Sequence, residues 1–178
     1  MSHADYDNDG DSDVLVLRGA WLRDQGRHPL SLLRNNGDAT FEDVTEAAGL
    51  LRFHPTQTGA WGDFDNDGWL DLFIGNESTQ GEIHPCELFH ANRDGTFTEV
   101  GASLGVAHVS MVKGAAWGDY NNDGRLDLYL SCLNAPNVLA SSEPLEQFAA
   151  APPDKLHGSM LCLRPAAPLR DVLVPAVL

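Results

Sequence analysis

Basic residues are scarce in this sequence. Its 178 residues include 11 Lys and Arg against 26 Asp and Glu, which gives a formal net charge of −15 at pH 7. A surface of this sign repels the phosphates of nucleic acids and the headgroups of anionic lipids. We therefore expect neither a nucleic acid nor a membrane surface among the partners.

Long apolar runs are also missing. No stretch approaches the roughly 18 apolar residues of a membrane-spanning helix. The N-terminal MSHADYDNDG has neither a basic nor an apolar region. We therefore expect no membrane insertion and no signal peptide within this chain. The hydrophobic content of 43% is nevertheless sufficient for a folded core.

Cysteines are few, and common active-site motifs are absent. Cys86, Cys132 and Cys162 are odd in number and far apart, so they form no disulfide framework or paired zinc motif. A Cys86–Cys132 bridge remains an alternative to free thiols. The sequence has no G-x-S-x-G elbow, no His pair with metal-ligand spacing and no Gly-rich phosphate loop. We expect no catalytic residues, no organic cofactor and no enzymatic activity.

What the sequence does contain is an acidic hexapeptide in three copies. DYDNDG at residues 5–10 recurs as DFDNDG at 63–68 and as DYNNDG at 119–124, with offsets of 58 and 56 residues. Each copy has a further Asp at its ninth position: Asp13, Asp71 and Asp127. The block LLRNNGDATFEDVTEAAGL from Leu32 matches LFHANRDGTFTEVGASLGV from Leu88, again with an offset of 56. Two landmarks with one period indicate an internal structural repeat.

Between these landmarks the sequence predicts short strands. Apolar, β-rich runs enter and leave the acidic loops, and two further runs flank a turn rich in Asn, Asp and Gly. The expected strands of the second copy are 59–62, 70–74, 88–90 and 96–100. Their counterparts are 32–34 and 40–44 in the first copy, and 115–118 and 126–130 in the third. Each repeat is thus a unit of four antiparallel strands.

Four short strands cannot bury both of their faces alone, so the units must pack on one another. We predict an all-β fold, a partial β-propeller of about two and a half four-stranded blades. Residues 1–139 would comprise a partial first blade, a blade at about 57–112 and a partial blade at 113–139. A solenoid or a sandwich of two sheets is the alternative. Four large residues are expected between the sheets: Trp61, Phe73, Trp117 and Tyr129.

The two ends of the chain depart from the repeat. Only Met1 to Ala4 precede the first acidic loop, so the first blade is expected to lack its incoming strand. Residues 140–178 have no acidic loop and are rich in Ala, Pro and Leu. We expect a divergent or disordered tail there, whether it is a linker, a divergent segment or a product of out-of-frame translation.

The acidic loops have the composition of a calcium site. Carboxylates at positions 1, 3 and 5 and a Gly at position 6 match the first half of an EF-hand loop. Hard oxygen ligands in a flexible loop favour Ca²⁺. The Glu of an EF-hand at position 12 is an apolar residue in every copy, so the ninth-position Asp would close the cage instead. The metal would then join two consecutive strands of one blade.

We assign up to three Ca²⁺ sites, each with four side chains and the backbone oxygen of position 7. Their residues are Asp5, Asp7, Asp9, Asp11 and Asp13; Asp63, Asp65, Asp67, Trp69 and Asp71; and Asp119, Asn121, Asp123, Arg125 and Asp127. Asn121 leaves the third site one carboxylate short, so this site is expected to bind calcium most weakly. The alternative, that Asp, Asn and Gly only form polar turns, does not explain three copies with the same ninth-position Asp.

The pattern G-A-W-G-D-[FY]-[DN]-N-D-G-x-L-D-L, followed by L-x-x-N-x-x-G-T-F, resembles the FG-GAP or VCBS repeats of integrin-α-like calcium-binding propellers, in the subgroup typified by cartilage acidic protein. The resemblance covers Ala4 to about Leu139. It implies a secreted or cell-surface module for adhesion or for binding a protein or carbohydrate ligand, with mainly structural Ca²⁺. The other blades of a parent protein would be further partners. A non-catalytic scaffold within a larger secreted enzyme and a purely structural role are the alternatives.

Two departures from the family pattern fall in the turn between the third and fourth expected strands of a repeat, a pair that we call the outer hairpin. Ala39 stands where N-x-G-D-G-T-F has its second Gly, and Arg93 of the second copy corresponds to Gly37 of the first. We expect the replacement at Arg93 to alter the hairpin turn.

Overall fold

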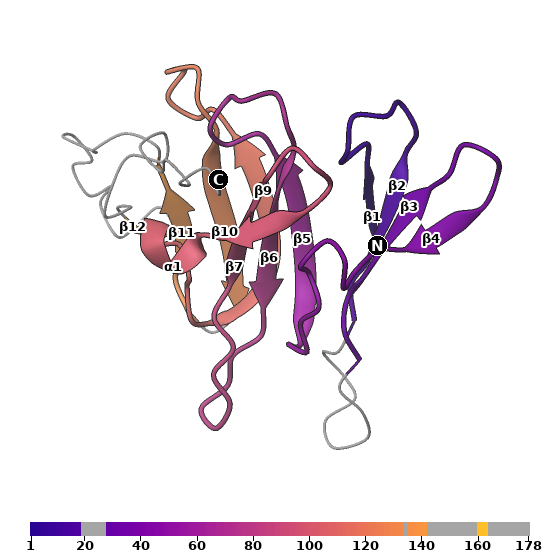
Figure 1. Ribbon diagram of the computed structural model, residues 1–178. Helices are drawn as coiled ribbons and strands as arrows, with labels where there is room; N and C mark the ends of the chain where they lie inside the picture. The colour runs from indigo at the N-terminus through magenta and orange to yellow at the C-terminus, as the bar shows by residue number, and fades with distance from the viewer. Residues whose placement is uncertain (19–27, 134, 142–159, 164–178) are drawn as a thin grey trace.

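The computed structural model describes residues 1–18, 28–133 and 135–141, and the backbone of 160–163. These residues form three four-stranded sheets and one helix of four residues (Figure 1). The predicted all-β fold is therefore confirmed.

Within each sheet the strands lie in chain order. The first sheet contains β1 (Ser2–Ala4), β2 (Asp13–Val16), β3 (Ser31–Asn35) and β4 (Phe41–Asp43). The second contains β5 (Thr56–Gly62), β6 (Asp71–Asn76), β7 (Glu87–Ala91) and β8 (Phe97–Glu99), and is followed by α1 (Gly101–Leu104). The third contains β9 (Met111–Gly118), β10 (Asp127–Leu133), β11 (Asn137–Ala140) and β12 (Met160–Leu163). All neighbours pair antiparallel except β11 and β12, which are parallel.

The three sheets are arranged as blades of a propeller. The first strand of each sheet faces the first strand of the next, so β5 lies between β1 and β9 (Figure 1). Apolar residues fill both gaps between the sheets. Because each sheet packs face to face with the next, the structure confirms a partial β-propeller.

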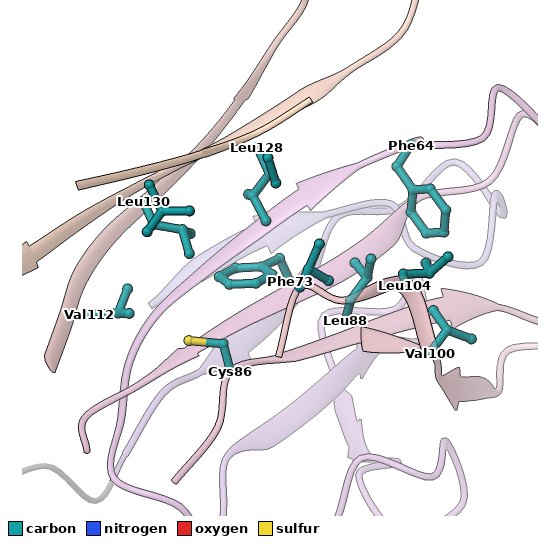
Figure 2. Packing of buried hydrophobic residues seen from close by; sticks show 12 residues of the cluster. Phe64, Phe73, Cys86, Leu88, Val100, Leu104, Val112, Leu128 and Leu130 are labelled. Carbon is teal, nitrogen blue, oxygen red and sulfur yellow. The ribbon is translucent and has the colours of Figure 1, made fainter. Parts of the chain in front are cut away.

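The middle sheet is buried on both faces, and β6 shows this most clearly. All six residues of β6 are buried. Leu72 and Ile74 belong to the core shared with the first sheet, whereas Phe73 belongs to the core shared with the third. Figure 2 shows Phe73 among Leu88 and Leu128 in this second core. A strand covered on both faces is apolar throughout, which explains the continuous run LFI in its sequence.

An aromatic pair recurs at each interface between blades. The ring of Tyr6, at position 2 of the first acidic loop, stacks on Trp61 of the second blade with centroids 6.4 Å apart. Phe64 stacks on Trp117 of the third blade in the same way, also at 6.4 Å. The indole of Trp117 donates a hydrogen bond to the Ala60 carbonyl at 3.1 Å. Trp61 and Trp117 therefore lie between the sheets, as predicted.

Trp117 also explains the glycine that precedes the second acidic loop. A Cβ on Gly62 would lie 2.6 Å from Cδ1 of the Trp117 indole, well inside the van der Waals distance. The equivalent Gly118 in the third blade has no atom within 4 Å of such a Cβ. The close approach of the third blade therefore requires glycine at residue 62, whereas no such contact requires it at residue 118.

Three expectations about the margins of the fold need correction or completion. The first blade does have an incoming strand, β1, although it has only 3 residues against 7 in β5. Tyr129 is 39% exposed, because no further sheet covers this face of β10 among the described residues. Within the expected tail, β12 pairs with β11, while 142–159 and 164–178 lie outside the described residues.

The expected change in the outer hairpin turn is wrong. Ala39 and Arg93 adopt left-handed conformations with φ of 69° and 67°, and Gly37 and Gly95 are left-handed at the corresponding positions. Both turns keep the same backbone hydrogen bond, from Asn36 to Thr40 and from Asn92 to Thr96. The flanking contacts hold the turn, so the two non-glycine residues accept an unfavourable φ.

The side chains of two of the three cysteines lie in the part of the chain that the structure describes. Cys86 and Cys132 are free thiols, so the alternative of a bridge between them is wrong. Burial raises the pKa of Cys86 to about 11, which makes it a packing residue and not a nucleophile. Within the described segments, no helix has the length and apolar character needed to cross a membrane.

Candidate metal centres in the acidic loops

Each acidic loop connects the first two strands of its blade, and the three loops lie at the same end of the structure, the upper end in Figure 1. The residue before each loop pairs with its ninth-position Asp in the ladder, as Gly62 does with Asp71. Positions 4 and 6 are left-handed in every copy, as Asn66 (φ 60°) and Gly68 (φ 89°) show. Asn and Gly are the residues that best tolerate this conformation, so the hexapeptide itself specifies the turn.

The same hydrogen bonds recur in all three loops. In the second loop, the position-1 carboxylate of Asp63 accepts the backbone N–H of Asp67 and of Gly68, both at 2.9 Å. The position-5 carboxylate of Asp67 accepts the N–H of Trp69 at 2.9 Å. The first and third loops have equivalent bonds at Asp5, Asp9, Asp119 and Asp123. Three sequences with one pattern thus fold into one loop conformation.

The ninth-position Asp is buried in all three blades. Asp71 is fully buried, and its carboxylate accepts the N–H of Phe64 at 3.1 Å and that of Ala91 at 2.9 Å. Asp13 accepts the equivalent bonds from Tyr6 and Asn35. In the first two blades this side chain therefore joins the loop to the third strand, and both of its oxygens already have a donor.

The structure brings the carboxylates of positions 1, 3 and 9 together in the first two loops. One ligand oxygen from each residue lies within 4.8 Å of the others in the sets Asp5, Asp7, Asp13 and Asp63, Asp65, Asp71. In the third loop, position 3 is an amide whose Nδ2 donates to the position-5 carboxylate at 2.9 Å, a contact between Asn121 and Asp123. The position-5 side chains and the position-7 carbonyls of Asp11, Trp69 and Arg125 stay predicted ligands.

The grouped carboxylates are partly withdrawn from water and lie close to one another. Burial, and then the charges of Asp71 and Asp67, raise the pKa of Asp65 to about 6. Burial also raises the pKa of Asp7, Asp13 and Asp71. A carboxylate with a raised pKa is one whose ionised form the surroundings disfavour. A cation at the centre of the group would remove this penalty.

Two basic residues of the outer hairpin contact the second loop, and sequence reasoning missed both. His90 Nδ1 lies 3.1 Å from Asp71 Oδ1 and 3.7 Å from Asp65 Oδ2. The hydrogen bond to Asp71 raises the pKa of His90. Arg93 Nη2 lies 2.8 Å from Asp67 Oδ2. His90 corresponds to Arg34 in the first copy, so a base at this position of the repeat was the one available hint.

The donor set fits a hard divalent cation. All side-chain donors at positions 1, 3 and 9 are carboxylate or amide oxygens, which Ca²⁺ prefers. Asp7 Oδ1 is a buried oxygen without a hydrogen-bond partner among the described residues, and Asp7 belongs to the first group. A buried acceptor in this state is costly unless something positive reaches it. A second group of Asp65, Asp67 and His90 offers one nitrogen ligand as well.

Comparison with known proteins identifies the family of the repeat. The family model described as an FG-GAP-like repeat matches residues 5–74 and 63–130. Human cartilage acidic protein 1 is 30% identical over 106 residues, which are 59% of this chain and 15% of that protein. The Xenopus tropicalis and mouse proteins of the same name are 30% and 29% identical, over 59% of this chain and 16% of their own length. The chain thus spans less than a fifth of these relatives, and by its matched repeats it belongs to the FG-GAP-like repeat family.

Proposed function

We propose that this chain is a calcium-binding propeller module without enzymatic activity, which functions outside the cell or on its surface. The observation that carries the proposal is the convergence of positions 1, 3 and 9 in the first two acidic loops. Three oxygen ligands from a short loop provide a site for Ca²⁺. At positions 3 and 9 of these two loops, burial raises the pKa of the carboxyl groups. Extracellular calcium is abundant enough for the dissociation constants of about 10⁻⁴–10⁻³ M that such modules have.

In this proposal the metal is mainly a structural staple. Asp63 directly follows β5, while Asp71 is the first residue of β6. An ion held by both would fix the end of one strand against the start of the next and neutralise the carboxylates between them. The residues of the chain would bind the ion, orient the loop and exclude water from the ninth-position carboxylate. The exposed loops would then be available for adhesion or for a protein or carbohydrate ligand.

Thermal melting with and without calcium tests the metal part of the proposal. We expect the melting temperature to rise by several degrees in millimolar Ca²⁺ and to fall again after chelation, because a ligand that binds only the folded state stabilises it. Magnesium should be less effective, since its small octahedral shell suits a flexible loop poorly. Equal melting temperatures in Ca²⁺ and in chelator, with no heat of binding in calorimetry, would exclude a calcium module.

Binding assays with the calcium-loaded protein test the ligand part. Glycan arrays and pull-downs from extracellular material should give signals that chelation removes. If both stay blank while calcium stabilises the fold, the module has a purely structural role and the ligand proposal fails.

A further inference from the structure

Neighbouring acidic loops are joined by one repeated contact. The side-chain amide of Asn8, at position 4 of the first loop, donates to the Gly68 carbonyl at position 6 of the second, at 3.2 Å. The amide of Asn66 donates to the Gly124 carbonyl of the third loop in the same way, at 3.1 Å. The residues of each pair are 60 and 58 apart in sequence, so the contact crosses from one blade to the next.

The backbone of the donor explains how its side chain reaches the next blade. Asn8 and Asn66 have φ of 58° and 60°, in the left-handed region. Each stands between the position-3 and position-5 residues of its own loop, so its side chain is free to point out of the loop while its neighbours carry the predicted ligands. The aromatic residue at position 2 contacts the same neighbouring blade. The amide therefore adds a polar contact beside an apolar one.

The acceptor glycine connects this contact to the next metal group. The N–H of Gly68 donates to the position-1 carboxylate of Asp63 at 2.9 Å. In the third loop the N–H of Gly124 donates to Asp119 at 2.9 Å. A glycine has no side chain to fix its left-handed conformation, so contacts on both of its flanking peptide groups help to hold it. Each Asn thus restrains the residue that orients the first ligand of the following loop.

Resting on the proposed calcium sites, we propose that Asn8 and Asn66 are positioning residues that couple the metal loops of adjacent blades. When one loop is held in its folded conformation, for example by a bound ion, it stabilises the ligand arrangement of the loop in the next blade. By thermodynamic linkage the effect is reciprocal, so occupation of the second loop also favours the first. Calcium binding by the module is therefore cooperative, and the cooperativity is carried by an amide that touches no metal.

The third loop supplies a matched control. Asn122 has the same sequence position and the same left-handed φ of 58°, but among the described residues no other loop accepts its amide. A change from Asn to Gly permits the left-handed conformation and removes the amide together with its CH₂ group. Any effect of glycine on the unfolded chain is the same at both positions. Asn8→Gly and Asn122→Gly thus differ in whether the contact to the second loop is lost.

The experiment is hydrogen exchange of the segment 63–71 during a calcium titration of the full chain. Neither substitution lies in this segment. In Asn8→Gly we expect faster exchange there without metal, and a shift of about fivefold in the calcium concentration that protects it, the effect of one ordinary hydrogen bond. Asn122→Gly should affect this segment much less, because it keeps the contact from Asn8 to Gly68 and the contact from Asn66 to Gly124. Asn66→Gly should have the same effect on 119–127.

The outcomes separate the coupling from the calcium proposal. If calcium protects no segment in the unsubstituted protein, the proposed calcium module fails, while the metal-free exchange rates still decide whether the amide orders the next loop. If calcium protects 63–71 but Asn8→Gly and Asn122→Gly behave alike there, the coupling is overturned and the module stands.

Discussion

Arg93 forms a two-pronged contact with Asp67, with its Nε at 2.9 Å and its Nη2 at 2.8 Å from the same carboxylate oxygen. The guanidinium is largely exposed, whereas the carboxylate is mostly covered. The hairpin of the second blade therefore supplies the acidic loop with a positive charge of its own.

Removing this charge should have opposite effects on the metal-free and calcium-bound protein. Arg93→Gln leaves Asp67 uncompensated, so we expect a slightly lower melting temperature in chelator. Calcium binding should become tighter, by up to about fivefold, because an exposed ion pair contributes at most about 1 kcal/mol. Calorimetry and melting curves measure the two effects. Arg52→Gln removes an ion pair with Glu87 away from the acidic loops and is the control. Weaker calcium binding in Arg93→Gln would contradict a competition between Arg93 and the ion.

Position 3 should decide the order of affinities among the loops. Asp65→Asn gives the second loop the amide of the third, and Asn121→Asp gives the third loop the carboxylate of the second. We expect calcium to protect 63–71 about tenfold more weakly in the first variant, and 119–127 about tenfold more tightly in the second, equivalent to about 1.4 kcal/mol each. Segment-resolved hydrogen exchange measures both shifts. Shifts in the same direction would show that side-chain charge at position 3 does not set affinity.

The metal-free protein should lose stability as the pH rises from 5 to 8. Burial raises the pKa of Asp65 to about 6, so the folded state holds this proton longer than the unfolded state, and ionisation destabilises the fold as the pH rises through that range. The pKa of His90 is also raised, so the stabilising charge of its imidazolium is lost at higher pH. The two effects therefore have the same sign.

Melting curves in chelator across this pH range check the expectation. Calcium should flatten or reverse the dependence, because it binds the ionised carboxylates. Asp65→Asn should reduce the slope in chelator. The exposed Asp38 and Asp94 have lowered pKa values and titrate below this range, so they do not affect it. Burial lowers the pKa of His108, so this group contributes with the opposite sign, and stability rises as its imidazole loses the proton in the unfolded chain. The comparison with Asp65→Asn therefore decides: an unchanged slope in this variant would refute the assignment of Asp65.

The contact between blades at Gly62 should tolerate no side chain. In Gly62→Ala the new methyl group would overlap the Trp117 ring, and relieving the overlap should cost about 1–3 kcal/mol. Gly118→Ala, with open space at the equivalent position, is the matched control and should change the stability little. Denaturant unfolding of both variants compares them directly. Equal losses would mean that packing against Trp117 does not explain the glycine.

The outer hairpins offer a reciprocal pair of substitutions. Ala39 has a left-handed φ of 69°, whereas Gly95 occupies the equivalent position of the second hairpin with φ of 82°. Ala39→Gly should stabilise the protein by about 0.5–1 kcal/mol, and Gly95→Ala should destabilise it by about 1 kcal/mol. Chemical unfolding measures both. A destabilising Ala39→Gly would show that the unfolded-state entropy of glycine exceeds the strain that it relieves.

The repeat made the regular part of the fold predictable. Strand periodicity and turn residues appeared in two or three copies, and each copy supported the assignment of the others. β1 was missed because three residues with no apolar alternation carry no strand signal; only pairing with β2 makes them a strand. Tyr129 was placed in the core by analogy with Phe73, but burial depends on whether a neighbouring sheet covers that face.

The candidate site was predictable only in its local part. The carboxylates at positions 1, 3 and 9 are close together because of their spacing along one loop. His90 and Arg93 contact second-loop residues that are 19 and 26 positions away in the sequence, and the amides of Asn8 and Asn66 reach a different blade. Such contacts depend on how strands and sheets stack in space, which the spacing of residues in a single chain does not encode.

The double burial of β6 has a consequence for how such a module could acquire new binding partners. A substitution in the middle of this strand disturbs two cores at once, one on each side. Variation that alters recognition without harming the fold must therefore concentrate in the loops at the two rims of the blades. The core residues would then change slowly in evolution, while the loops at the rims could change their binding surfaces without altering the fold.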